Sequence, residues 1–346
     1  MPDIPASFPY KTLLITGGTG TFSHAMVTYL LAHYADITIR LLSRDEYKQE
    51  QMERTFGNSQ LRFLLGDVRD LSRLHTACAG VDLCVHAAAL KVIGKGEYDG
   101  EDFHKTNVLG TLNVMKACQM AGVQQAIFLS SDKASEAWNV YGLTKALASA
   151  LWIQGNHYAP QGTRLAVVKY GNVMGSRGSV VEVWREAMNL GRSCLVTDPL
   201  MSRFWMTAQE AVALVVWTAL HGLRGGIVVP HLPAFTLGDL RSAMQSEPNW
   251  QSIGRRPGEK LHELLMTDEE MARSYWYGPS DRTPVHYIIP PLSQRWGSSD
   301  ERAFWTVPPT DMAYGMVPRE HQVPYTSQTW PWRLTVDDLR QKLKDI

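Results

Sequence analysis

The chain has 346 residues, of which 45% are hydrophobic and 20% are charged, and its 34 Lys and Arg residues balance 34 Asp and Glu residues. This composition is typical of a soluble globular protein, and the zero formal net charge excludes a global field that would recruit nucleic acid or an anionic membrane. The longest strongly apolar window, Ala211 to Leu220, is too short to span a bilayer, which takes about 20 residues. Four cysteines without a CxxC pair predict no metal site and suit a reducing cytoplasm.

Short apolar runs alternate with polar segments of helix length along the first half of the chain, after an N-terminal stretch that is predicted to be a loose arm. The predicted strands are Thr12–Thr16, Ile37–Leu42, Leu61–Leu65, Leu83–His86, Ala126–Leu129 and Leu165–Lys169, and the clearest helices are Asn107–Met120 and Tyr141–Tyr158. This alternation is typical of α/β proteins with a doubly wound parallel sheet. Six such strands predict a complete dinucleotide-binding fold.

The pattern changes after Gly175, where short helices are punctuated by glycine and, farther on, tryptophan and proline become dense. We therefore predict a nucleotide-binding domain over residues 10–172, with a returning strand within about 205–235, and a smaller C-terminal substrate lobe and tail over 173–204 and 236–346. Pro290–Pro331 is predicted to be loop. Thr335–Asp338 resembles a capping box that opens a terminal helix.

A glycine-rich turn follows the first predicted strand, where the backbone can approach a pyrophosphate and helix amides can face it. The residues assigned to this site are Gly17, Thr19, Gly20, Thr21 and Phe22, with Ser23 in place of a third glycine. Such a turn alone is a weak signal, because an ordinary strand-to-helix loop can have the same composition. Its place after the first strand favours the dinucleotide interpretation.

The end of the second predicted strand carries Ser43, Arg44 and Lys48 instead of an acidic residue. Cations at this position favour a 2'-phosphate, and therefore NADP over NAD. The alternative is a solvated helix start, which Asp45 and Glu46 also fit. Farther along the chain, Asp67 and Val68 follow the third strand and are predicted to meet the adenine.

Two further motifs carry candidate catalytic groups: Ser131-Asp132-Lys133, and Tyr141 with Lys145 four residues later. Tyr141 and Lys145 share one face of a helix. A neighbouring ammonium and a positively charged nicotinamide would lower the pKa of the Tyr141 phenol and make it a base for a hydroxyl proton. A YxxxK pair is common on helix surfaces, but here it follows a glycine-rich turn and the fifth strand.

Taken together, these motifs resemble the extended short-chain dehydrogenase/reductases, and within them the soluble inverting UDP-N-acetylglucosamine 4,6-dehydratases. The resemblance rests on Ser131–Ala134, Asn139–Gly142, Lys169–Val173, Gly175–Ser179, Thr197–Pro199, Met201, Arg203–Phe204 and Arg256–Leu261. It implies a cytoplasmic, homo-oligomeric lyase that is redox-neutral, keeps NADP tightly bound and turns a UDP-amino sugar into a 4-keto-6-deoxy sugar for glycan biosynthesis.

The resemblance also implies roles for individual residues. Tyr141 takes the proton of the hydroxyl at carbon 4, Lys133 in its neutral form removes the proton at carbon 5, and Asp132 donates a proton to the leaving hydroxyl at carbon 6. The neutral form requires that neighbouring positive charge and desolvation lower the pKa of Lys133. Further cofactor contacts are implied for Ala87, Ala88, Asn107, Tyr170 and Asn172. Substrate contacts are implied for Lys91, Asn172, Arg177, Gly178, Ser179, Thr197, Met201, Arg203, Arg256 and Glu259.

Some features depart from this family, so other functions stay open. Ser131 stands where threonine is usual, and Val92–Gly100 is unlike the usual sequence at the expected sugar position. A UDP-hexose or UDP-N-acetylhexosamine 4-epimerase would share Tyr141 and Lys145 but would not need an acid–base pair at Asp132 and Lys133. A non-catalytic NADP-binding regulatory protein would retain the fold and use it for partner binding.

Overall fold

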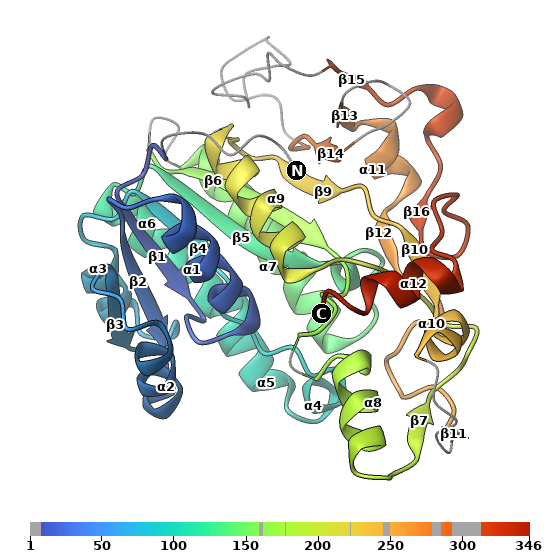
Figure 1. Cartoon of the computed structure of the whole chain (residues 1–346). Helices are drawn as coiled ribbons and strands as arrows, with labels where there is room; N and C mark the ends of the chain where they lie inside the picture. Colours follow the sequence, from blue (N-terminus) through green and yellow to red (C-terminus); the bar gives the residue numbers. More distant parts are fainter. Residues whose placement is uncertain are drawn as a thin grey trace.

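A large twisted sheet with helices on both faces forms the centre of the molecule in the computed structural model (Figure 1). The structure describes residues 8–158, 162–176, 178–221, 223–244, 250–278, 285–292 and 313–346. Among these residues the sheet has the strand order β15-β13-β14-β9-β6-β5-β4-β1-β2-β3.

The parallel part of this sheet confirms the predicted fold class. It consists of β1 (Thr12–Thr16), β2 (Thr38–Ser43), β3 (Leu61–Leu65), β4 (Leu83–His86), β5 (Gln125–Ser131), β6 (Arg164–Tyr170) and the returning β9 (Ile227–Pro230). The strand order reverses beside β1, so the carboxyl ends of β1 and β4 open a crevice, which is where doubly wound sheets bind ligands.

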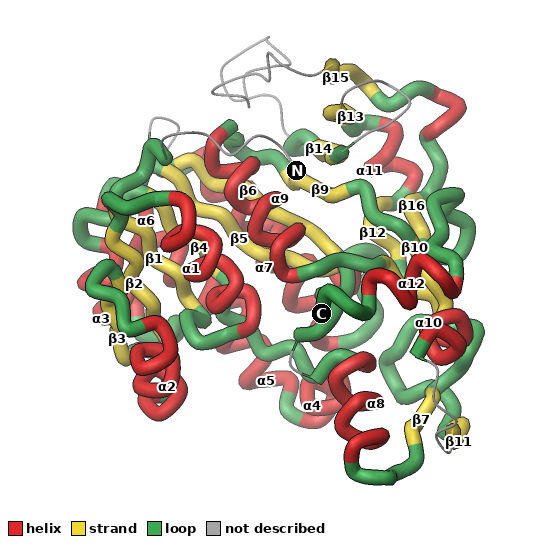
Figure 2. Tube along the Cα trace, viewed as in Figure 1, coloured by secondary structure: helices red, strands yellow, loops and turns green. Residues whose placement is uncertain are grey.

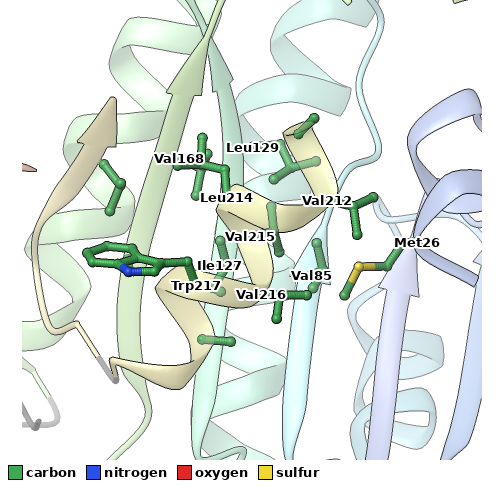
Figure 3. Close-up of a cluster of buried hydrophobic side chains, with 14 of the residues drawn as sticks. Met26, Val85, Ile127, Leu129, Val168, Val212, Leu214, Val215, Val216 and Trp217 are labelled. Atoms are coloured by element: carbon green, nitrogen blue, oxygen red, sulfur yellow. The ribbon is translucent and has the colours of Figure 1, made fainter. Parts of the chain in front are cut away.

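Helices cover both faces of the sheet because its central strands are apolar on both sides. One face carries α1 (Thr21–His33), α2 (Glu46–Phe56) and α9 (Ala208–Leu220), and the other carries α3 (Leu71–Cys78), α6 (Gly110–Ala121) and α7 (Val140–Gln154). Figure 3 shows Val212 and Val215 of α9 against Val85, Ile127 and Val168 of the sheet. The apolar window at Ala211–Leu220 is therefore a core helix.

Three short elements lie between β4 and α6: α4 (Ile93–Tyr98), α5 (Gly100–Phe103) and a π-helical turn, η1 (His104–Leu109). The helix predicted over Asn107–Met120 therefore begins as a π-helical turn and becomes regular only at Gly110. β5 ends at Ser131 and is followed by a 3-10 turn, η2 (Asp132–Ala134), so that Asp132 and Lys133 lie in this turn. A second 3-10 turn, η3 (Gly155–His157), ends the helix that was predicted to reach Tyr158.

Three antiparallel strands extend the sheet beyond β9: β14 (His286–Ile289), β13 (Tyr275–Gly278) and β15 (Ala313–Met316). The prediction that Pro290–Pro331 contains only loop is wrong for β15, for the 3-10 turn η4 (Arg319–His321) and for β16 (Tyr325–Thr326). These elements are too short for a periodic pattern, and their pairing partners lie far away in the sequence.

The remaining elements form a smaller lobe along the right-hand side of Figure 2. They are α8 (Val180–Asn189), β7 (Cys194–Val196), β8 (Ser202–Phe204), β10 (Ala234–Thr236), α10 (Leu237–Ala243), β11 (Trp250–Ser252), β12 (Leu264–Met266), α11 (Asp268–Ala272) and α12 (Val336–Lys342). A separate core that includes Trp184, Trp205 and Phe235 holds much of this lobe together. The terminal helix begins at the predicted capping box, with Thr335 as its N-cap.

The predicted loose arm is packed from residue 8 onward, and residues 1–7 lie outside the described part of the chain. The Phe8 ring stacks on Tyr34 with 5.0 Å between centroids, and the Tyr10 hydroxyl donates to the Ala219 carbonyl at 2.9 Å. The arm therefore closes the edge of the core beneath α1 and α9.

Candidate active site

A cavity of 1950 Å³ lies along the carboxyl ends of the parallel strands and continues into the smaller lobe. Pockets for a single drug-sized ligand are usually about 300–1000 Å³, so this cavity can hold two ligands of nucleotide size. At one end its wall consists of the turn after β1, and at the other end it consists of residues from α8, β8 and the 256–259 loop.

The turn between β1 and α1 is shaped for a close approach of the backbone to a ligand. Gly17 has φ +70°, and a Cβ atom there would lie 2.9 Å from the Ala88 nitrogen. A Cβ atom on Gly18 would lie 2.8 Å from the Leu41 Cβ. Gly20 is the N-cap of α1, and no side chain caps this helix end. The turn therefore presents backbone amides to the cavity, as pyrophosphate binding requires.

The cations predicted at the ribose end line the cavity, but both have acidic partners. Lys48 Nζ lies 2.5 Å from Asp45 Oδ2, and Arg44 Nη1 lies 3.8 Å from Asp67 Oδ2. Asp67 itself is not part of the cavity wall, whereas the neighbouring Val68 is. Arg69 also pairs with Asp67 at 2.7 Å, so Asp67 holds the loop that positions Val68.

Tyr141 and Lys145 enter the cavity from the first turns of α7. The side chain of Asn139 caps this helix by accepting a hydrogen bond from the Gly142 N–H at 2.7 Å. This cap fixes the start of the helix and therefore the position of Tyr141 in its first turn. Lys145 Nζ donates to the Leu129 carbonyl and lies 3.9 Å from the centre of the Phe128 ring. Burial lowers the pKa of Lys145 to about 7, so its charge depends on what fills the cavity.

The pKa of Tyr141 differs from the prediction. Burial raises this pKa, and the hydrogen bond with Ser131 and the positive charge of Lys133 oppose the increase. Burial therefore outweighs the lowering of the Tyr141 pKa that was expected from a neighbouring ammonium. Among the side chains of the protein, Ser131 and Lys133 are the groups that favour the phenolate.

Asp132 and Lys133 form a close ion pair at the cavity wall. Lys133 Nζ lies 2.9 Å from Asp132 Oδ1 and 3.1 Å from Oδ2, and Ser131 Oγ donates to the same Oδ1 at 2.8 Å. Burial raises the pKa of Asp132 despite the positive charge of Lys133. Burial alone would lower the pKa of Lys133, but the carboxylates of Asp132 and Glu263 raise it. The predicted lowering of the Lys133 pKa is therefore wrong.

The arginines assigned to a diphosphate differ in their surroundings. Arg203 lines the cavity, but its guanidinium donates to the carbonyls of Ser202, Leu261 and Lys260. Arg256 is 63% exposed in its side chain and lies 3.7 Å from Glu259. Arg203 is thus held within the wall, whereas Arg256 is free to turn toward a ligand. Arg177 lies outside the described residues.

Two buried polar atoms near these arginines have no hydrogen-bond partner among the described residues: Asn172 Oδ1 and Ser179 Oγ. Both residues line the cavity. Because an unsatisfied buried polar group costs about 1–3 kcal/mol, a ligand with donor and acceptor groups fits this part of the wall.

The structure gathers most of the predicted site residues in this one cavity. Its wall includes Gly17, Thr19, Gly20, Thr21, Phe22, Ser43, Arg44, Lys48, Val68, Ala87, Ala88, Lys91, Ser131, Asp132, Lys133, Tyr141, Lys145, Tyr170, Asn172, Gly178, Ser179, Thr197, Met201, Arg203, Arg256 and Glu259. Asn107 is not in the wall. It is buried and braces the loop after β4 by accepting from the Leu90 N–H at 2.8 Å.

Glu263 is a residue of this region that the sequence interpretation missed. Its Oε1 lies 3.0 Å from Lys133 Nζ and 3.6 Å from Arg203 Nε. The feature of the sequence that could have indicated Glu263 is its place two residues after the Arg256–Leu261 motif.

Membrane spans and metal sites are both absent from the described residues. No helix in this part of the chain is long and apolar enough to cross a membrane. Within the same residues, no group of three or more His, Cys, Asp or Glu side chains is arranged to hold a metal ion.

Comparison with known proteins identifies the family. A profile described as "Polysaccharide biosynthesis protein" matches residues 13–281. The chain is 39% identical to a UDP-N-acetylglucosamine 4,6-dehydratase (inverting) of Campylobacter jejuni over 78% of this chain and 81% of that protein. It is also 40% identical to a UDP-glucose 4-epimerase of Rickettsia akari over 81% of this chain and 86% of that protein.

A solved structure extends the likeness to nearly the whole chain. The X-ray structure of Pen from Bacillus thuringiensis superposes with a TM-score of 0.84 at 30% sequence identity and covers 97% of each chain. The profile match spans most of the sheet and the cavity, and it agrees with the two curated relatives. The chain therefore belongs to the polysaccharide biosynthesis protein family.

Proposed function

We propose that this protein is a nucleotide-sugar dehydratase that acts on UDP-N-acetylglucosamine, removes water across carbons 5 and 6, and inverts carbon 5. The observation that carries this proposal is the Asp132–Lys133 pair, with 2.9 Å between Lys133 Nζ and Asp132 Oδ1, beside Tyr141 in one cavity. An elimination needs both an acid and a base near the sugar, and this pair supplies them.

A nicotinamide cofactor fits the end of the cavity formed by the glycine turn. Gly17 and Gly20 shape the turn, the uncapped start of α1 would face the pyrophosphate, and Tyr170 lies in the wall near Tyr141. When bound, the cofactor would supply hydride transfer, first from carbon 4 and later back to carbon 6. We expect NADP because Arg44 and Lys48, two cations that follow β2, line the cavity and would favour a 2'-phosphate.

The side chains of the protein account for the proton movements. Tyr141 takes the proton of the hydroxyl at carbon 4. One proton crosses from Lys133 to Asp132, which converts the ion pair into an amine and a carboxylic acid. Lys133 then takes the proton from carbon 5, while Asp132 gives its proton to the hydroxyl leaving carbon 6, so that water departs. Lys133 finally returns a proton to carbon 5 from the opposite face. The proton that Tyr141 took from the hydroxyl at carbon 4 then passes to the Asp132–Lys133 pair, which restores the ion pair and the Tyr141 base for the next cycle.

The UDP half of the substrate would lie in the smaller lobe, which makes this lobe the substrate domain. Arg256 and the unsatisfied atoms of Asn172 and Ser179 are placed to bind the diphosphate and its ribose. Arg203 would contribute mainly positive charge, because its donors are engaged by backbone carbonyls.

Incubation of the purified protein with UDP-N-acetylglucosamine tests this proposal. A product lighter by one water, with deuterium at carbon 5 and the inverted configuration when the reaction runs in deuterium oxide, is the expected result. The 4-epimerase named by the Rickettsia relatives is the competing function. A 4-epimer of unchanged mass would replace the dehydratase with that epimerase.

The family resemblance also favours a homo-oligomer in the cytoplasm. Leu143 and Leu147 lie four residues apart on α7 and are 52% and 49% exposed, which gives an apolar stripe for a second copy. Sedimentation of the purified protein tests for self-association, and loss of the larger species in Leu143→Glu would link it to this stripe.

A further inference from the structure

The carboxylate of Glu263 contacts Lys133 but does not line the cavity. Its residue is 2% exposed. One oxygen, Oε1, contacts Lys133 Nζ at 3.0 Å, while the other, Oε2, is buried without a hydrogen-bond partner among the described residues. A buried carboxylate is costly unless it is paired, so its contact with Lys133 needs an explanation.

The backbone holds Glu263 firmly in this place. Its N–H donates to Ser327 Oγ at 2.8 Å, and the Ser327 N–H donates to the Glu263 carbonyl at 2.8 Å. Ser327 Oγ also contacts Ser202 in β8, beside Arg203. The position of the carboxylate is therefore fixed by contacts between three segments and does not depend on the rotamer of an exposed side chain.

The charged groups alternate in sign along a row of Asp132, Lys133, Glu263 and Arg203, and all of them except Glu263 line the cavity. Lys133 is held between two carboxylates, and Glu263 lies between two cations. Removal of Glu263 would leave the Lys133 nitrogen anchored from one side only and Arg203 without its carboxylate. An ion pair that only stabilises the core would not need to reach a cavity. This row, in contrast, includes Asp132 and Lys133, the two groups assigned to the elimination.

We infer that Glu263 is a positioning residue for the elimination: it fixes the Lys133 nitrogen beside Asp132 and keeps one shared proton on that pair. The inference rests on the proposed function. Because the negative charge of Glu263 disfavours loss of the shared proton to solvent, the proton that leaves Lys133 passes to Asp132, which then carries the proton that the leaving hydroxyl requires. Glu263 itself stays a carboxylate opposite Arg203 throughout the cycle.

Glu263→Gln tests this inference with readouts that a purely structural role would not move. We expect kcat for water loss to fall about tenfold, within the range for acid–base groups, with KM changed less than about threefold because Glu263 does not line the cavity. Loss of an anion 3.0 Å from Lys133 should also move the basic limb of the kcat–pH profile down by about one pH unit or more.

Two further variants complete the test. Glu270→Gln is the matched control, because Glu270 forms a similar ion pair with Lys169 at 2.9 Å and neither residue lines the cavity. It should leave the pH limb in place. Glu263→Asp keeps the charge and should restore the limb toward the wild-type position, and it replaces the glutamine variant if that chain fails to fold.

The outcomes separate this inference from the proposed function. Failure of the wild-type protein to remove water would remove the dehydratase proposal itself. Wild-type dehydration together with an unshifted pH limb in Glu263→Gln would overturn only the role of Glu263. Equal loss of activity in Glu263→Gln and Glu270→Gln, with no shift in either profile, would also contradict it.

Discussion

The two ends of the cavity are built in different ways. At the cofactor end, the wall comes from residues that directly follow parallel strands, such as Gly17 after β1, Ser43 at the end of β2 and Ala87 after β4. At the sugar end, Glu263 contacts both Lys133 and Arg203, and Ser327 joins Glu263 from 64 residues farther along the chain. The first end is a property of strand ends, whereas the second exists only once distant segments have packed.

This difference decides how each end responds to change. A substitution in the glycine turn acts directly on the backbone that faces a ligand. A substitution in the smaller lobe acts through hydrogen bonds and charges that position Asp132 and Lys133. Substitutions at the two ends of the cavity should therefore differ in their effects.

Gly17→Ala is expected to have the largest effect at the cofactor end. An alanine would have to adopt φ +70° with its Cβ 2.9 Å from the Ala88 backbone, so cofactor affinity should fall at least about tenfold. Gly122→Ala is the control, since it shares φ +70° but a Cβ there meets nothing within 4 Å. It should cost only about 1–2 kcal/mol of stability. Fluorescence titration with the cofactor and thermal unfolding separate the two effects.

Acidification should destabilise the protein through two buried histidines. Burial lowers the pKa of both His86 and His286 to about 3. Because the folded-state pKa lies below the unfolded value, their contribution to stability is complete above about pH 6.5 and is lost as the pH falls toward 3. Urea unfolding between pH 7 and pH 4 should show decreasing stability. A flat profile over this range would contradict the assignment.

The same two histidines should differ at neutral pH. His86 bonds Thr16 at 2.6 Å and Thr111 at 3.0 Å, whereas the ring nitrogens of His286 have no such partner among the described residues. His86→Phe should therefore lower stability by about 1–3 kcal/mol, and His286→Phe should change it by less than about 1 kcal/mol. Thermal unfolding at pH 7.5 measures both variants.

Ser327→Ala should weaken the sugar end. The change leaves the buried Glu263 N–H without its acceptor at 2.8 Å, which should cost about 1–3 kcal/mol and lower the rate of water loss more than cofactor affinity. Ser242→Ala is the control, because Ser242 lies at an exposed position of α10 and its hydroxyl donates to the Gly238 carbonyl of the same helix. Equal losses of cofactor affinity and dehydration rate would show that the two ends are not separable.

Arg44→Ala should give the smallest effect. Its guanidinium is half exposed and pairs only loosely with Asp67, at 3.8 Å, so removing it should leave the fold intact. We expect the preference for NADP over NAD to fall about tenfold through loss of one phosphate contact. An unchanged preference in cofactor titrations would remove Arg44 from the ribose site.

The sequence predicted the cofactor end better than the sugar end for physical reasons. The glycine turn, the YxxxK spacing and the parallel strands are local patterns, and the structure shows each of them where it was expected. Glu263 could not be recognised in this way, because only packing against Ser327 and Lys133 reveals its environment. The direction of the Lys133 pKa was wrong because the carboxylates of the adjacent Asp132 and the distant Glu263 together outweigh burial. Only the contribution of Glu263 depends on packing between distant segments.

Lys133→Met tests the central claim most directly, namely that the Asp132–Lys133 pair makes this protein a dehydratase. Lys116→Met, an exposed change on α6, is the control and should behave as wild type. With UDP-N-acetylglucosamine and NADP, the Lys133 variant should still oxidise carbon 4, seen as absorbance of reduced cofactor, and should lose water at least about a hundredfold more slowly. Dehydration at the wild-type rate by Lys133→Met would contradict the account.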